Sequence, residues 1–117
     1  MHPSLPGSGP AYPMDKPQKS VVNIQVRRDN TQITLTNTSA RDFPAAKLWL
    51  NGQFAREVPP LPIGATQTFD LYSFKNEFAE SFRAGGFFST ERSEKLVLAQ
   101  YELPDEMVGL IVVHPEK

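Results

Sequence analysis

The sequence predicts an all-β protein, an antiparallel β-sandwich of about seven strands with one short inserted helix. Apolar and polar residues alternate over most of the chain beyond residue 20, which is the pattern of strands buried on one face. Turn residues separate these runs at short intervals, as they do in sandwiches. The chain has 117 residues, which is enough for one domain with a single hydrophobic core.

The first nineteen residues differ from the rest in composition. They hold five of the eleven prolines, at positions 3, 6, 10, 13 and 17, and few large apolar side chains. Prolines at this spacing favour extended, polyproline-like backbone. We therefore expect residues 1–19 to be a disordered, proline-rich spacer and residues 20–115 to form the β-sandwich domain.

The domain begins with a predicted hairpin. The segments VVNIQVRR (residues 21–28) and TQITLTN (31–37) have apolar residues at every second position, and Asp29-Asn30 between them are typical of a tight turn. After the second strand, the side chains of Asn37-Thr38-Ser39 can bond nearby backbone, which fits a chain that leaves a sheet. The same residues match the N-glycosylation sequon, which matters only in a secreted eukaryotic chain.

A second hairpin is predicted at Asn51-Gly52, the strongest short-range hairpin signal in the chain. The strand KLWLN leads into it and QFAREV follows it. Leu48 and Leu50 share one face of the first strand, and Trp49 lies on the other face among polar neighbours. We therefore expect the two leucines in the core and an exposed Trp49 ring.

The remaining strands lie in the second half of the chain. In VPPLPIGATQTFDL (58–71), prolines carry the chain across the domain, Gly64 marks a turn, and a strand ends near Leu71. KLVLAQYEL (95–103) and MVGLIVVHP (107–115) form a last pair. Both are apolar on both faces, which suits central strands or strands covered by a partner. If the final strand lies at an edge, its unpaired backbone favours a homodimer.

The segment SFKNEFAESFRAGG departs from the strand pattern. Phe74, Phe78 and Phe82 are four residues apart, with Ser73 available as an N-cap and Gly85 as the residue after the C-cap. This spacing predicts a short helix over about residues 73–84 that closes an open end or edge of the sandwich. Its phenylalanines would form one buried ridge, so we expect replacement of Phe78 to destabilise the domain strongly.

Three stretches, ITLTNTS, LWLNG and VPPLPIGATQTFDL, resemble the immunoglobulin-like and fibronectin type III-like accessory domains of bacterial secreted and envelope proteins. In that group, a strand ending in Asn-x-Ser precedes an extended loop, and a Leu-x-x-Gly turn introduces the next strand. The resemblance covers residues 20–72 and departs from the group at the inserted helix and the missing cysteine pair.

The resemblance implies an immunoglobulin-like architecture and a scaffold or interaction role. It also implies a location in the bacterial cell envelope or periplasm, anchored or secreted. The proline-rich spacer is consistent with a signal peptide or anchor ahead of this segment. We expect membrane contact only through such an anchor, outside this chain.

Composition excludes several classes of function. The chain has no cysteine, so it can form no disulfide, no thiolate metal site and no thiol nucleophile. Twelve Lys and Arg residues nearly balance thirteen Asp and Glu residues, and the net charge of -1 provides no long-range attraction for nucleic acid. The sequence shows neither a calcium loop nor a glycine-rich phosphate loop, so we expect no metal site and no cofactor.

The sequence also offers no catalytic constellation. The two histidines, His2 and His114, lie near the ends of the chain, so a Ser-His-Asp arrangement has no base in the core. Glu77 and Glu80 are predicted on the convex surface of the helix, whereas a glycosidase pair must flank a cleft. We therefore predict that the protein is not an enzyme and has no catalytic residues.

Two hypotheses about function stay open. The first is a non-enzymatic accessory or protein-interaction domain of the bacterial envelope, whose partner is another protein or a second copy of the chain. The alternative is a carbohydrate- or peptide-binding module that uses exposed aromatic rings. Its candidate ligand-binding residues are Trp49, Tyr72 and Tyr101.

Overall fold

The computed structural model of the chain describes residues 9–85 and 92–113. Seven strands and one 3₁₀ turn account for its regular structure. The strands are β1 (Gln18–Asp29), β2 (Gln32–Asn37), β3 (Ala46–Leu50), β4 (Phe54–Val58), β5 (Thr66–Asp70), β6 (Ala99–Glu102) and β7 (Met107–Val112), and the 3₁₀ turn η1 (Leu71–Ser73) follows β5.

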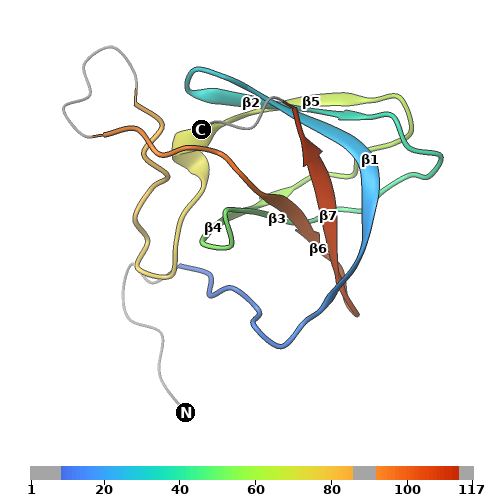
Figure 1. Cartoon of the computed structure of the whole chain (residues 1–117), viewed down its shortest axis with the longest axis horizontal. Helices are drawn as coiled ribbons and strands as arrows, with labels where there is room; N and C mark the ends of the chain where they lie inside the picture. The colour runs from blue at the N-terminus through green and yellow to red at the C-terminus, as the bar shows by residue number, and fades with distance from the viewer. Residues whose placement is uncertain (1–8, 86–91, 114–117) are drawn as a thin grey trace.

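All seven strands belong to one mixed sheet, in the order β4-β3-β6-β7-β1-β2-β5. Every neighbouring pair is antiparallel except β1 and β7, which run parallel. The sheet curls into a half-barrel, so that β2 and β5 at one end lie opposite β3 and β4 at the other (Figure 1). The two edge strands approach at Arg56 of β4, whose guanidinium carbon lies 4.7 Å from the ring centre of Phe69 in β5.

The inner face of the curled sheet encloses the main hydrophobic core. Successive side chains of a strand lie on opposite faces, so alternate residues of each strand point inward. Phe43 and Leu61, in two different connections, form an isolated bridge and add their side chains to this core. Its buried members include Ile24, Val26, Ile33, Leu35, Leu48, Leu50, Phe74, Phe82 and Tyr101.

The predicted antiparallel, immunoglobulin-like sandwich is therefore wrong, although the number of strands is right. A sandwich buries its core between two sheets, whereas here one sheet bends far enough to enclose the core with its own inner face. Alternation in the sequence reports which residues of a strand are buried, but not which strand lies beside it. The two folds consequently have similar patterns of apolar residues.

The predicted hairpins are confirmed. β1 and β2 pair up to Asp29 and Gln32, and Asn30 between them has a positive φ of 59°. In the β3–β4 turn, Asn51 and Gly52 have φ values of 55° and 66°, the left-handed conformation that Asn and Gly adopt most readily. β6 and β7 also pair as predicted. Because β7 lies between β6 and β1 rather than at an edge, the reason given for a homodimer does not apply.

The predicted helix over residues 73–84 is wrong. After η1 the chain runs out and back as two extended arms, and Lys75 and Ser81 form an antiparallel bridge between them. Phe74 and Phe82 lie on these arms and are buried, whereas Phe78 lies at the tip and is 72% exposed. The four-residue spacing of the three phenylalanines thus reflects two extended arms joined by a turn, and not a helix. Within the described residues, no helix is long and apolar enough to cross a membrane.

Asn37 marks the point where the chain leaves the sheet, as predicted. Its side chain is buried, and its Nδ2 donates to the carbonyl oxygens of Arg41 at 2.9 Å and Leu61 at 3.0 Å. Its Oδ1 accepts from the backbone N–H of Ser39 at 3.0 Å. All these bonds hold the loop in shape, so Asn37 has a structural role and its amide nitrogen is not available at the surface.

Residues 9–17, which we call the strap, lie against the outer face of the sheet (Figure 1). The sequence predicted a disordered spacer up to residue 19; β1 instead begins at Gln18 and the strap makes specific contacts, while residues 1–8 lie outside the described part. The Tyr12 ring meets the Trp49 ring edge-on at 5.2 Å. Trp49 is consequently buried, and the prediction of an exposed Trp49 is wrong even though Leu48 and Leu50 are in the core as predicted.

Candidate functional site

Residues 76–80, which we call the Phe78 turn, expose a large apolar side chain, the ring of Phe78. Asn76 orders this turn, since its Oδ1 accepts from the N–H groups of Phe78 and Glu80, both at 2.9 Å. The N–H of Asn76 also donates to the carbonyl of Glu80 at 3.0 Å. Ala79 has a φ of 64°, an uncommon conformation for a residue with a side chain. The backbone beneath the exposed Phe78 ring is therefore fixed by several bonds.

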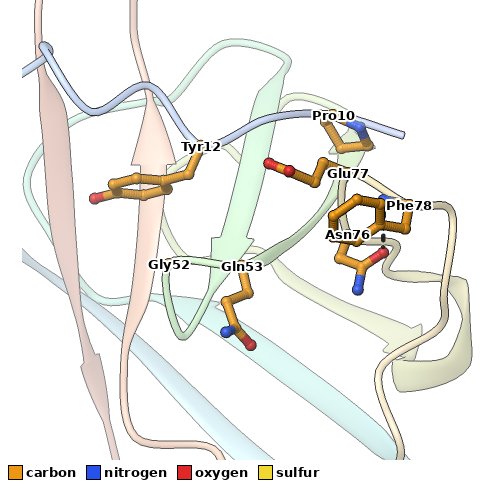
Figure 2. Close-up of a pocket in the computed structure, with 7 residues that line it drawn as sticks. All are labelled: Pro10, Tyr12, Gly52, Gln53, Asn76, Glu77 and Phe78. Atoms are coloured by element: carbon orange, nitrogen blue, oxygen red, sulfur yellow. Dashed lines mark hydrogen bonds between the residues drawn. The ribbon is translucent and has the colours of Figure 1, made fainter. Parts of the chain in front are cut away.

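A hollow of about 180 Å³, the aromatic pocket, lies beside this turn. Figure 2 shows its three sides: the strap with Pro10 and Tyr12, the β3–β4 turn, and the Phe78 turn. Glu77 extends its carboxylate from the Phe78 turn toward the Tyr12 side. The lining residues are Pro10, Tyr12, Gly52, Gln53, Asn76, Glu77 and Phe78.

A second, larger hollow of about 460 Å³ also borders Pro10, and we call it the β4 groove. It follows the outer edge of β4 and is lined by Gly9, Pro10, Lys47, Ala55, Arg56, Glu57, Ser73, Lys75 and Ala79. Three of these side chains are cationic and one is acidic. In a chain with a net charge of -1, this groove is a local concentration of positive charge.

The polar groups of the β4 groove are partly preorganised. Arg56 donates to the Ser73 hydroxyl and to the carbonyl of Glu57, both at 3.0 Å. Ala55 exchanges two backbone hydrogen bonds with Lys75, at 2.9 and 3.0 Å. Residues two apart on a strand direct their backbone groups to the same side, so the N–H of Glu57 also points outward from the edge.

The strap is held above β3 and β6 by a charged group, Glu102. One carboxylate oxygen accepts from the Nε1 of Trp49 at 2.9 Å, and the other accepts from the Nζ of Lys16 at 3.0 Å. Partial burial raises the pKa of Glu102, but the hydrogen bonds from Trp49 and Lys16, with the charges of Lys16 and Lys47, outweigh it and leave the pKa below its ordinary value of 4.5. The ionised form therefore stabilises the folded chain.

The three aromatic residues that the sequence singled out do not come together. Trp49 lies under the strap, and Tyr101 is buried on the inner face beside Phe43. Tyr72, in η1, is 39% exposed, and its hydroxyl donates to the carbonyl of Gly85. Two of these rings are thus inside the protein, so the three cannot form a shared exposed platform.

The exposed aromatic ring of the site, Phe78, escaped sequence reasoning, as did Tyr12. Phe78 looked like the middle of a buried ridge, and Tyr12 belonged to a segment with no periodic pattern. The sequence did contain one signal against a helix. Asn side chains can hydrogen-bond to nearby backbone N–H groups and so stabilise turns in place of helix, and Asn76 does this here.

The site contains no recognisable catalytic or metal-binding set. Among residues 9–85 and 92–113, no group of three or more His, Cys, Asp or Glu side chains could hold a metal ion. Glu77 and Glu80 lie on the Phe78 turn, where Glu80 is tied to the amide of Asn76 at 2.9 Å. The two histidines, His2 and His114, lie outside the described residues.

Fold and site together define a class: an all-β half-barrel with an aromatic pocket and a cationic groove at its rim. Comparisons with protein-family models, with curated proteins and with solved structures find no match for this chain. The resemblance to immunoglobulin-like and fibronectin type III-like domains is likewise not supported by the fold. The chemistry of the rim is therefore the evidence for the function of this chain.

Proposed function

We propose that the protein is a non-enzymatic protein-interaction domain that binds a short segment of a partner protein at the aromatic pocket and the β4 groove. The observation that carries this proposal is the Phe78 ring, 72% exposed on a turn that several hydrogen bonds hold in place. Full burial of a Phe side chain stabilises by about 1.5 to 3 kcal/mol relative to exposure. A partner that covers this ring gains part of that free energy.

The setting of Phe78 distinguishes it from a ring exposed by chance. Single exposed apolar side chains are common on protein surfaces. Phe78, however, borders a hollow that also exposes Pro10 and Tyr12, and aromatic anchors beside pockets are typical of the residues that contribute most to binding. An ordered backbone also reduces the conformational entropy lost on binding.

The charges of the rim favour a particular kind of partner. Lys47, Arg56 and Lys75 face the β4 groove, so a segment with acidic side chains is complementary to it. An apolar or aromatic side chain of the same segment would fill the aromatic pocket. The expected ligand is an acidic peptide with one large apolar residue.

Selection from a random-peptide display library against the immobilised chain tests this proposal. We expect enriched peptides that carry Asp or Glu around an apolar residue, and at least tenfold weaker binding to Phe78→Ala, which corresponds to about 1.4 kcal/mol. Ile63→Ala is the matched control, because Ile63 is 55% exposed and lines neither hollow. Equal binding to the wild type and Phe78→Ala would contradict the proposal.

A carbohydrate-binding module is the second candidate. It is favoured by the composition of the aromatic pocket, where the rings of Tyr12 and Phe78 lie with the amides of Gln53 and Asn76. A glycan array separates the two candidates: binding of a glycan that is lost in Phe78→Ala, with no peptide enriched, favours the carbohydrate. The predicted location in the bacterial envelope stays a prediction in either case.

A further inference from the structure

The outer face of the sheet beneath the strap has the features of an occupied peptide-binding site. We call this surface, formed by Trp49 of β3, Gln100 and Glu102 of β6, and Met107 of β7, the strap face. Trp49, Gln100 and Met107 are all buried, and the strap residue Tyr12 packs against the cluster that contains Trp49 and Met107. Their burial therefore depends on a segment outside the sheet.

Tyr12 is the first anchor of the strap. Its ring lies 5.2 Å from the Trp49 ring in an edge-on arrangement, at an interplanar angle of 86°. Its hydroxyl donates to the Oε1 of Gln100 at 2.9 Å, and the Nε2 of Gln100 donates to Gln18 at 2.7 Å. The strap face thus offers both an aromatic surface and a buried amide to one tyrosine.

Lys16 is the second anchor, four residues further on. Its Nζ donates to Glu102 and to the carbonyl of Leu103, both at 3.0 Å. Between the anchors, Met14 is 86% exposed and Asp15 is exposed, so the middle of the strap contributes little. The strap face therefore holds the strap mainly through two side chains, Tyr12 and Lys16, four residues apart.

Backbone contacts hold the strap on either side of these anchors. The N–H of Met107 donates to the carbonyl of Pro17 at 2.8 Å, and the N–H of Gly9 donates to the carbonyl of Glu77 at 2.9 Å. Gly109 in β7 leaves room for the side chain of Gln18, the first residue of β1 after the strap, since a Cβ there would come within 2.8 Å of the Gln18 amide. The face is shaped for an extended segment.

We propose that the strap face is a binding site for an extended peptide with Tyr and Lys four residues apart, and that it accepts the strap of a second copy in place of its own. The contacts of the two anchors are the same in both arrangements, because the two straps are identical. The strap is outside the sheet order, and exchange needs a hinge only where the strap joins β1. The contacts of Pro17 and Gln18 to Met107 open there, while the rest of the sheet stays paired. This inference is independent of the role of Phe78.

The effective concentration of a tethered segment decides when exchange occurs. A short tether keeps its segment at a local concentration on the order of millimolar. A second copy or a free peptide therefore competes with an intact strap only near that concentration, and competes at lower concentration when the strap is weakened.

The test uses the full chain with both anchors replaced, Tyr12→Ala with Lys16→Ala, and the emission of Trp49, the single tryptophan. We expect red-shifted emission that iodide quenches. Adding the peptide GPAYPMDKP, residues 9–17, should restore the wild-type emission, with half-saturation below about 1 mM. A control peptide with both anchors changed to Ala should bind at least tenfold more weakly. Equal effects of the two peptides, or no effect at about 1 mM, would overturn the proposal.

Two further measurements keep the proposal testable. If circular dichroism shows that the double variant is unfolded, Tyr12→Ala, which retains Lys16 and removes the ring that covers Trp49, serves as the host for the same titration. For the exchange itself, sedimentation equilibrium of the wild type at about 1 mM should show a dimer that added peptide dissociates, and a strictly monomeric chain there overturns that part. Phe78→Ala should leave peptide binding at the strap face unchanged.

Discussion

The two faces of the curled sheet are buried in different ways. The inner face is filled by apolar side chains from all seven strands and from the connections between them. The outer face is covered over a small area by the strap, through one aromatic contact and a few polar contacts to Trp49, Gln100 and Glu102. Loss of an inner side chain removes packing that holds several strands, whereas loss of the strap exposes one cluster and leaves the sheet paired.

The largest expected effect lies on the inner face. Leu48→Ala removes a fully buried side chain and should lower the free energy of unfolding by about 2 to 5 kcal/mol, because it leaves a cavity. Urea denaturation measures the change. Leu98→Ala is the matched control, since Leu98 is 37% exposed and the same substitution there should cost under about 1 kcal/mol. Similar costs at both positions would contradict the description of the core.

On the outer face, Tyr12→Ala should cost less, about 2 kcal/mol, from the lost ring contact and the lost hydrogen bond to Gln100. Trp49 emission should shift to the red in the folded variant. Tyr12→Phe retains the ring and should cost about 1 kcal/mol or less. If Tyr12→Ala leaves both stability and emission unchanged, the strap does not protect Trp49.

Tyr101→Phe should stabilise the protein by about 1 kcal/mol, because among the described residues the buried Tyr101 hydroxyl has no hydrogen-bond partner. Burial also raises the pKa of Tyr101 from 10.0 to about 12. The folded state favours the neutral hydroxyl more strongly than the unfolded state does. The ionisation of Tyr101 therefore does not lower the stability of the wild type below pH 10, and it does so as the pH rises through about 12. Thermal midpoints measure both effects. At pH 7 the midpoint of Tyr101→Phe should be higher than that of the wild type, and in the alkaline range it should fall less steeply with pH.

Acid should loosen the strap before it affects the inner face. The pKa of Glu102 lies below 4.5, so its contribution to stability is present above that pH and is lost as the pH falls through the lower, folded value. Iodide quenching of Trp49 should therefore increase below pH 4.5. Glu102→Gln should lose this pH dependence, and Asp105→Asn, at an exposed position, should keep it.

The smallest expected effect concerns Phe78. Phe78→Ala should change the free energy of unfolding by no more than about 0.5 kcal/mol, because the ring is exposed and the turn is held by Asn76. This expectation reverses the one drawn from the sequence. A chemical denaturation curve decides between them, and a cost of about 3 kcal/mol would place the ring in the core.

Local features of the fold could be predicted from the sequence, and the arrangement of the strands could not. The hairpins at residues 29–32 and 51–54 depend on turn residues and alternation within a few positions, and both are confirmed. The parallel pairing of β1 with β7 joins segments about ninety residues apart, which no local pattern specifies. One curled sheet was consequently mistaken for two packed sheets.

The candidate site shows the same limit. Trp49 was placed on the correct face of its strand, and its burial comes from a strap whose sequence has no periodic pattern. Phe78 was assigned to a helix by its spacing, although the Asn76 side chain stabilises a turn instead. Both errors arose where a few side-chain contacts, rather than periodic burial, determine the structure.

The position of β7 has a consequence for synthesis on the ribosome. β7 is made after the other six strands but lies in the middle of the sheet, between β6 and β1. Until it leaves the exit tunnel, the nascent chain can form only two separate halves, β4-β3-β6 and β1-β2-β5, each with an unpaired inner edge. Unpaired edges attach readily to other chains. This domain therefore depends on a single late segment to join its halves, and its strand edges are most open to other chains in the interval before that segment emerges.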